Sequence, residues 1–173
     1  MKNVEVKQPY RDLAFFADSM HGSLARKLRI FGLNTTYMRS ICDELVMSYC
    51  IKERRILLTS DKGLFKRSLK KRIDVVLLQG HSDMENMVKI FSQYKIKNVL
   101  FDSEFARCPV CNRELEKKKS NNLSGKIPPK TLQLCFWFYQ CKGCEKIYWE
   151  GSHTPALVAL ADSVNQELNK LYS

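Results

Sequence analysis

Short apolar runs alternate with amphipathic segments over the first hundred residues of the chain. Five runs have the length and composition of β-strands, at residues 13–17, 35–38, 55–59, 73–78 and 96–101. Most of them are apolar at consecutive positions, which is typical of strands buried on both faces of a parallel sheet. Helices between the strands would cover those faces. The pattern therefore predicts an α/β domain with three layers, α/β/α, around a mainly parallel sheet.

Segments with helical spacing separate these runs, at residues 23–31, 40–53, 63–71 and 82–94. Two of them open on a capping box, formed by Ser40 with Asp43 and by Ser82 with Glu85. One face of the second helix should be buried, and its apolar residues are Ile41, Leu45 and Tyr49.

Two of the predicted strands are followed by a carboxylate. Asp18 directly follows the first run, and Asp61 comes two residues after the third. In an open parallel sheet, ligands bind beyond the carboxyl ends of the strands, so neighbouring strands would bring the two acids together. Clustered carboxylates suit Mg²⁺ or Mn²⁺, and a cation held by them can promote hydrolysis of a phosphodiester. Asp43 or Glu44, in the second helical segment, is a candidate third ligand.

The same acids have ordinary structural uses. Asp18 and Asp61 both precede predicted helices, where Asp is a favoured N-cap residue, and Asp43 is the capping-box partner of Ser40. These residues alone do not separate a helix cap from a metal ligand. The chain contains neither the G-x-G-x-x-G nor the G-K-[ST] motif of nucleotide-binding folds, so we expect no nucleotide cofactor.

The composition changes after Phe101. Two C-x-x-C pairs, separated by 29 residues, supply four thiolates for a tetrahedral zinc site: Cys108, Cys111, Cys141 and Cys144. A polar loop at 120–130 and an aromatic strand at 134–141 lie between the pairs, as a hairpin-based zinc ribbon requires. So small a module buries little apolar area, and the metal would supply much of its folding energy. We expect a zinc ribbon at 105–153 and an amphipathic C-terminal helix at 154–173.

The remaining cysteines and histidines carry weaker signals. Cys42, Cys50 and Cys135 lie in apolar or aromatic stretches and are expected to pack rather than to bind metal. His153 is interpreted as a structural or surface residue, because four cysteines already complete a zinc shell. His21 is isolated in the sequence and is expected at the surface.

The composition favours a folded, basic protein. With 173 residues and 45% hydrophobic residues, the chain can form one domain and a small second module. Lys and Arg outnumber Asp and Glu by 29 to 18, which favours a polyanionic partner, nucleic acid first. No apolar stretch approaches the ~20 residues of a membrane span, and the N-terminus lacks the apolar core of a signal peptide. We therefore expect no membrane association and an intracellular, cytoplasmic location.

Basic residues follow the two strand-end acids on the next helices. The candidate nucleic-acid contacts are Arg26, Lys27 and Arg29 after Asp18, and Lys66, Arg67 and Lys70 after Asp61. A phosphodiester strand needs this arrangement, because cations neutralise its backbone while a metal acts on one phosphate. The alternative is a solvated helix face.

Several stretches of the chain also occur in a characteristic order: FFADSMHGSLARKLRIFG, RILLTSDKGL, RCPVCN, IPP and CKGCEKIYWEGSH. In this order they resemble the Mut-seven C-terminal RNase domain family, a branch of PIN-like nucleases fused to a zinc ribbon. The resemblance runs from about Phe15 to His153. It implies a PIN-like domain at 1–104, followed by the ribbon, and a divalent-metal ribonuclease site.

The resemblance also assigns site residues. Asp18 matches the acid of the family's first strand, Asp61 the acid after LLT, and Asp43 or Glu44 an acidic pair that opens the second helix. The four cysteines match the ribbon ligands. Two positions depart from the family pattern: Asn34 stands where the family usually has Asp, and Lys27 where an aromatic residue is frequent. One carboxylate fewer weakens the catalytic case.

Two functional hypotheses follow. In the first, the protein is a metal-dependent ribonuclease in which Thr59 and Ser60 position water or a phosphate. In the second, it is a non-catalytic module that holds RNA or a protein partner, such as the C-terminal part of a larger exonuclease. Convergence of three acid oxygens on one cation position would favour the enzyme.

Overall fold

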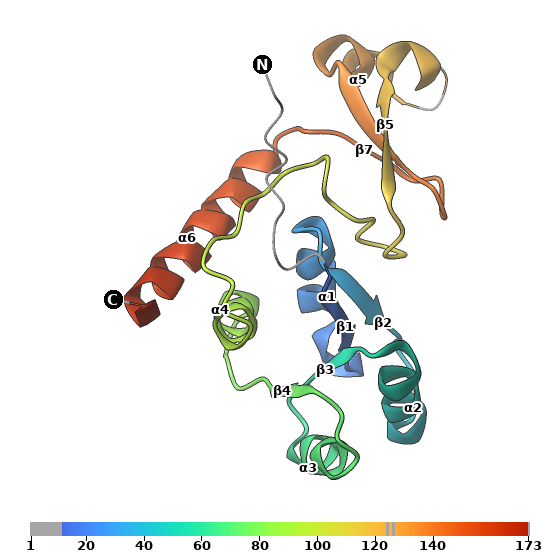
Figure 1. The fold of residues 1–173 in the computed structure, drawn as a ribbon. Helices are drawn as coiled ribbons and strands as arrows, with labels where there is room; N and C mark the ends of the chain where they lie inside the picture. The colour runs from blue at the N-terminus through green and yellow to red at the C-terminus, as the bar shows by residue number, and fades with distance from the viewer. Residues whose placement is uncertain (1–11, 124, 126, 173) are drawn as a thin grey trace.

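The computed structural model describes residues 12–123, 125 and 127–172. Its first part is a parallel sheet with the strand order β2-β1-β3-β4 (Figure 1). The strands are β1 (Ala14–Ala17), β2 (Asn34–Tyr37), β3 (Ile56–Thr59) and β4 (Val75–Leu77). The helices are α1 (Gly22–Ile30), α2 (Asp43–Glu53), α3 (Lys62–Lys70), α4 (Asp83–Gln93) and α6 (Thr154–Tyr172), with a 3₁₀ turn at Ser19–His21.

The sheet is covered on both faces, which confirms the predicted α/β/α architecture. Phe15 and Leu58 point to one face, where they pack with residues of α1, α4 and α6. Phe16 and Leu57 point to the other face, where they pack with residues of α2 and α3. Neighbouring residues of one strand are therefore both buried, and this explains why the strands are apolar at consecutive positions.

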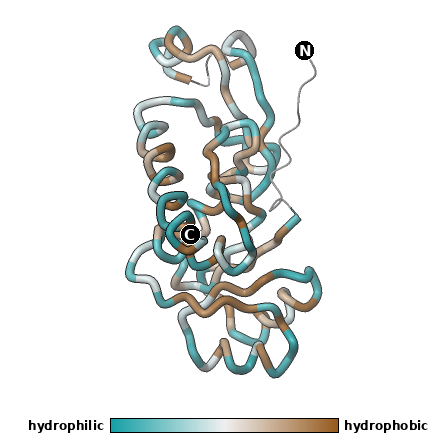
Figure 2. The backbone as a smooth tube through the Cα atoms, turned by 60° about the vertical axis from the view of Figure 1, so that its left-hand side comes forward, coloured by the Kyte–Doolittle hydropathy of each residue, from teal (hydrophilic) through white to brown (hydrophobic). Residues whose placement is uncertain are grey.

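The C-terminal helix belongs to the larger core. Ala161, Val164 and Leu168 of α6 are buried in the same cluster as Phe91 of α4. The alternation of brown and teal along α6 shows its amphipathic pattern (Figure 2). None of the helices within the described residues is long and apolar enough to span a membrane.

The cysteine-rich part forms a small antiparallel sheet with the order β5-β6-β7. It consists of β5 (Leu115–Lys119), a 3₁₀ turn at Ser120–Leu123, α5 (Pro129–Leu134), β6 (Trp137–Cys141) and β7 (Ile147–Tyr148). The short helix α5 was not predicted, and it shortens the expected aromatic strand at 134–141. A separate small cluster of Leu123, Ile127 and Phe138 fills this part. Cys135 packs against that cluster, as predicted.

Residues 96–101 do not form the predicted fifth strand. Ile96 and Val99 are buried in the larger core, but this segment does not join the sheet. Instead, the N–H of Val99 donates to Oδ1 of Asn165 at 2.8 Å, and Nδ2 of Asn165 donates to the carbonyl of Val99 at 2.9 Å. The side-chain amide on α6 thus satisfies the backbone groups that a neighbouring strand would otherwise satisfy.

The start of α2 also differs from the prediction. The helix begins at Asp43, and its N-cap Cys42 makes no side-chain capping bond, so the Ser40–Asp43 capping box does not form. The buried face carries Val46, Met47 and Cys50, while Leu45 is 53% exposed. Cys50 packs in the core as predicted, whereas Cys42 is exposed.

At the start of α4, Ser82 caps the helix as predicted, and the Glu85 carboxylate reaches back to His81, the residue before the cap, rather than to the N–H of Ser82. Oγ of Ser82 accepts a hydrogen bond from the N–H of Glu85 at 3.2 Å, and the Glu85 carboxylate accepts from the N–H of His81 at 3.0 Å. The two boxes have the same spacing in the sequence. Only the second has its helix beginning one residue after the serine, which is the geometry that capping requires.

Candidate functional site

The carboxyl ends of β1 and β3 lie side by side at one edge of the sheet. Ala17 is opposite Leu58 in the parallel register, and the N–H of Asp18 donates to the carbonyl of Leu58 at 3.0 Å. Asp18 and Asp61 therefore lie at the same edge, as their positions after the strands predict. We call the polar residues gathered here the carboxylate rim: Asp18, His21, Ser23, Thr59, Ser60, Asp61 and Asp83.

Asp18 is held at the rim by two hydrogen bonds. It is only 8% exposed, and its Oδ2 accepts from Oγ1 of the fully buried Thr59 at 2.8 Å. Its Oδ1 accepts from the N–H of Ser19 at 2.6 Å, which caps the 3₁₀ turn. The Thr59 hydroxyl oxygen also accepts from the N–H of Asp61 at 3.0 Å. One threonine hydroxyl thus connects both strand-end acids.

Asp61 caps α3. Its Oδ1 accepts from the N–H of Gly63 at 2.5 Å and from the N–H of Leu64 at 2.8 Å. These backbone bonds, first that of Leu64, lower the pKa of the Asp61 carboxyl. The capping interpretation is therefore correct for both aspartates. It leaves Oδ2 of Asp61 without a hydrogen bond in the described part of the chain, and this oxygen can still bind a cation.

A guanidinium lies beside the expected third acid. Arg67 on α3 forms an ion pair with the carboxylate of Asp43 at the start of α2, and its charge also contributes to lowering the pKa of Asp61. Glu44 is exposed. Within the described residues, the only group of three or more acids, histidines or cysteines whose ligand atoms lie within 4.8 Å of one another is the four cysteines. The three acids thus do not converge on one cation position in this conformation.

The sequence did not indicate three members of the rim, His21, Ser23 and Asp83. His21 is not an isolated surface residue, because its Nε2 lies 2.9 Å from Oγ of Ser60. Burial lowers the pKa of His21, against the opposing effect of the Asp18 and Asp83 charges, and thereby favours the neutral imidazole. This pairing joins positions 39 residues apart. Such a contact leaves no local signal in the sequence.

Asp83, an acid that the sequence analysis did not single out, is the first residue of α4. Its Oδ2 accepts from Oγ of Ser23 at 2.6 Å and forms an ion pair with Lys27 of α1. The rule that identified Asp18 and Asp61 applies to Asp83 as well, since it follows the fourth strand. In the sequence this signal is masked, because Asp83 also lies inside the capping motif that begins at Ser82.

The structure separates the six basic residues into three groups, the third of which is Arg29 alone. Arg26, Lys66 and Lys70 are exposed, and the described residues offer them no ion pair. Lys27 is half-buried and Arg67 is exposed, and each is paired with an acid, Asp83 and Asp43 respectively.

Arg29 is not a surface contact, and its prediction as a nucleic-acid ligand is wrong. Its side chain is 5% exposed, and its guanidinium donates to three backbone carbonyls. These are Thr35 on β2 at 2.8 Å, and Pro109 and Val110 at 2.9 and 3.1 Å. The last two lie between the first pair of cysteines. Arg29 therefore holds the turn at residues 108–111, which we call the first cysteine knuckle, against α1 and β2.

A second set of bonds joins the knuckle to β2. Oδ1 of Asn112 accepts from the N–H of Thr35 at 3.1 Å, and its Nδ2 donates to Oδ1 of Asn34 at 2.8 Å. Arg55 donates to the same Asn34 oxygen at 3.0 Å. Asn34 is opposite Ala14, at the amino end of the strands, so it lies at the other end of the sheet from Asp18. The asparagine at this position therefore removes no carboxylate from the rim.

The four ribbon cysteines are positioned to hold a metal ion. Their sulfurs all lie within 4.8 Å of one another, with Cys111 to Cys141 at 3.3 Å and Cys108 to Cys144 at 3.6 Å. Tetrahedral zinc with bonds of ~2.3 Å places its sulfurs roughly 3.8 Å apart, so the donor type and spacing fit zinc.

The environment of Cys108 favours its thiolate form. Burial raises the pKa of this thiol, but hydrogen bonds from the Tyr148 hydroxyl and from the backbone N–H groups of Cys111 and Val110 outweigh burial and lower the pKa. At Cys144, by contrast, a backbone hydrogen bond is outweighed by burial and by hydrogen bonds with the other thiols, which raise the pKa. The Tyr148 oxygen lies 3.2 Å from Sγ of Cys108. A thiolate is the form that binds metal, so the surroundings prepare Cys108 as a ligand.

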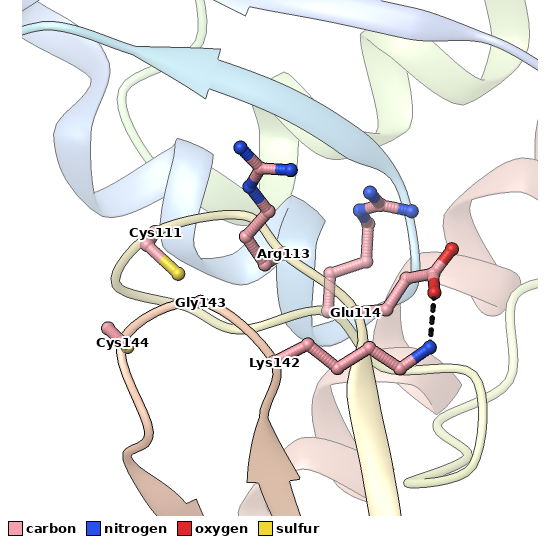
Figure 3. Close-up of a pocket in the computed structure, with 7 residues that line it drawn as sticks. Cys111, Arg113, Glu114, Lys142, Gly143 and Cys144 are labelled. Carbon is pink, nitrogen blue, oxygen red and sulfur yellow. Dashed lines mark hydrogen bonds and ion pairs between the residues drawn. The ribbon is translucent and has the colours of Figure 1, made fainter.

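An open cleft of about 680 Å³ lies beside the thiols. Cys111, Gly143 and Cys144 line one side, and the ion pair between Lys142 and Glu114 lies on the other (Figure 3). Arg107 and Arg113 add positive charge to its lining. The cleft belongs to the ribbon and includes none of the rim residues.

Comparison with protein families assigns the chain as a whole. The family model described as Mut7-C RNAse domain matches residues 13–160, which include the rim, Arg29 and all four ribbon cysteines. The chain belongs to the Mut7-C RNase domain family. No curated protein and no solved structure gave a significant match. Membership of Mut7-C agrees with the resemblance of the motifs and with a nuclease-like family.

The metal centre generates the first prediction. Replacing Cys108 with Ser removes one thiolate and should abolish binding of about one zinc per chain and lower the melting temperature. Elemental analysis and thermal unfolding measure the two effects. The exposed Cys42→Ser is the matched control and should keep the zinc content without lowering the melting temperature, because Ser is a favoured residue at this N-cap of α2. A Cys108→Ser protein with full zinc content and stability would refute the site.

The second prediction concerns the buried guanidinium. Arg29→Met keeps the length of the side chain but leaves three carbonyls without their donor, and should lower the free energy of unfolding by about 2–4 kcal/mol. Arg26→Met, on the exposed face of the same helix, should change it by about 0.5 kcal/mol or less. Urea unfolding of the two variants provides the test. Equal stabilities would show that the bonds of Arg29 contribute little.

Proposed function

We propose that the protein is a divalent-metal-dependent ribonuclease that hydrolyses RNA phosphodiester bonds at the carboxylate rim. The observation that carries the proposal is the pairing of Asp18 and Asp61 at one sheet edge, connected through the Thr59 hydroxyl. Membership of an RNase domain family supports the same class of reaction. The position of the rim, at the carboxyl ends of parallel strands, is where ligands of such sheets bind.

Asp18 and Asp61 would hold Mg²⁺ or Mn²⁺, since both cations prefer carboxylate oxygens. Such a cation supplies activation of water and neutralisation of charge on the phosphodiester. Asp18 is suited to this role because Thr59 and Ser19 fix its orientation. Asp61 is suited because its cap uses Oδ1 alone, so Oδ2 can face the cation.

Arg67 gives the rim a way to respond to RNA. Its side chain is 49% exposed and is paired with Asp43. An incoming phosphate can therefore replace the Asp43 carboxylate as the partner of the guanidinium. Release of Asp43 would then add an acid from α2 to Asp18 and Asp61, with Glu44 as its neighbour. In this proposal the arginine keeps the acids apart without substrate and contacts the phosphate with it.

His21 and Ser60 supply a polar pair beside the acids. Burial favours the neutral imidazole, which can accept a proton from water or donate a hydrogen bond to a phosphate oxygen. Ser60 orients the ring through its hydroxyl. Arg26, Lys66 and Lys70 remain as backbone contacts for RNA, because their charges face solvent.

The second candidate is a non-catalytic module that binds RNA or a protein partner. The observation that favours it is the ion pair of Asp43 with Arg67, which compensates one acid without any metal. The two candidates differ in one measurable property. Only the enzyme requires a cation at Asp18 for turnover of RNA.

The third prediction tests catalysis. Asp18→Asn keeps a hydrogen-bond acceptor for Thr59 but removes the charge, and should lower Mn²⁺-dependent cleavage of a labelled single-stranded RNA by about 100-fold or more. The control Asp162→Asn, on the exposed side of α6, should cleave at the wild-type rate. Circular dichroism checks that both variants are folded. Undiminished cleavage by folded Asp18→Asn would exclude the rim as the active site.

The fourth prediction concerns the basic surface of α3. Replacing Lys66 and Lys70 with Gln should weaken RNA binding and flatten its log–log salt dependence by roughly 0.7 for each lysine–phosphate pair removed. Fluorescence anisotropy at several salt concentrations gives both quantities. The matched double variant Lys89→Gln and Lys95→Gln removes the same charge from α4 and its end, and should keep the wild-type slope. Equal slopes in the two double variants would contradict a specific role for α3.

A further inference from the structure

The ribbon carries an aromatic pair that its own core does not use. Phe136 is 64% exposed and Trp137 is 39% exposed. Their rings lie 5.1 Å apart at an angle of 89°. The next residue, Phe138, is fully buried with Leu123 and Ile127 on the other face of the strand. The small core is thus built from the opposite face, and the exposed pair adds nothing to it.

Lysines from the neighbouring strand surround this pair. Lys119 is the direct cross-strand partner of Trp137, and its Nζ lies 5.9 Å from the centre of a Trp137 ring. Nζ of Lys117, two residues earlier on β5, lies 4.5 Å from that centre and is also paired with Glu104. We call Lys117, Lys119, Phe136 and Trp137 the aromatic hairpin surface.

We propose that the aromatic hairpin surface binds single-stranded RNA, with a base stacked on Trp137 and the lysines against the flanking phosphates. Every base has a flat π-face, so exposed aromatic rings within a basic surface suit a single strand of any sequence. A protein partner is less favoured, because lysine is depleted in protein interfaces while two lysines lie against this aromatic pair. The net charge of +11 acts in the same direction.

This surface is separate from the rim. The ribbon is joined to the amino end of β2 through Asn112, whereas the rim lies at the carboxyl ends of β1 and β3. In Figure 1 the hairpin that contains β5 extends away from the parallel sheet. A strand cleaved at the rim would therefore be held by the hairpin at a distance from the cleaved bond. The inference rests on the proposed function only for the choice of RNA as the nucleic acid.

Binding can be measured without cleavage. The probe is a fluorescein-labelled, fully 2′-O-methylated 15-nucleotide oligo-U, and its affinity for the whole chain is read by anisotropy. Trp137→Ala should weaken binding roughly 5- to 100-fold, the change expected on removal of one stacked base. Trp137→Phe keeps an aromatic face and should recover most of that affinity. Lys119→Gln should flatten the salt dependence, by roughly 0.7 in log–log slope.

Trp149→Phe serves as the matched control and as a reporter. Trp149 is 42% exposed in the same ribbon but contacts Phe138 rather than the exposed pair. This variant should keep the wild-type affinity, and it leaves Trp137 as the sole tryptophan of the chain. Stacking of a uracil on Trp137 should then quench its fluorescence at the concentrations at which anisotropy rises.

The outcomes separate this inference from the proposed enzyme. Unchanged affinity in Trp137→Ala, with full zinc content and no quenching in Trp149→Phe, would overturn the inference and leave the surface for a protein partner. In that case, loss of cleavage in Asp18→Asn would still support the ribonuclease. Conversely, weaker binding by Trp137→Ala supports the hairpin surface even where no cleavage of unmodified RNA is found.

Discussion

The buried guanidinium of Arg29 is the interaction on which the relation between the sheet and the ribbon depends. Burying a charge away from water costs free energy unless the charged group is hydrogen-bonded. Here carbonyls of β2 and of the first cysteine knuckle accept hydrogen bonds from the guanidinium. Both carbonyls from the knuckle belong to residues between Cys108 and Cys111, two of the four cysteines positioned to hold a metal. The positions of the first two cysteines and of the edge strand β2 therefore depend on each other through Arg29.

The segment before the knuckle passes close to the end of α1, and this close approach requires a glycine there. Gly32, just after α1, has a φ of +85°, and a Cβ atom there would lie 2.9 Å from the carbonyl oxygen of Phe105. Only glycine combines that backbone conformation with so close an approach. The chain can thus cross the end of α1 and bring the knuckle against Arg29. Asn112, which has a φ of +67°, completes the contact with β2.

At the rim, the cap that Asp61 forms leaves one of its oxygens for the proposed cation. A carboxylate has two oxygens, and the cap of α3 occupies only Oδ1 of Asp61. Backbone donors favour the charged form of this group, which is also the form that binds a cation. Arg67 meanwhile compensates the charge of Asp43. Structural and catalytic roles for these acids are physically compatible.

The sequence by itself determined the elements with strong local causes. The apolar runs predicted the parallel sheet, and the acids after the first and third strands predicted the position of the rim. The C-x-x-C pairs predicted the cluster of thiols. All three features depend on the spacing of residues along the chain. Tertiary structure decided what depends on distant partners. Asn165 replaced a strand neighbour for Val99, so an apolar run became a buried coil. Arg29 and the exposed Arg26 lie three residues apart on one helix, yet only packing against the knuckle made one of them a buried link between the ribbon and the sheet.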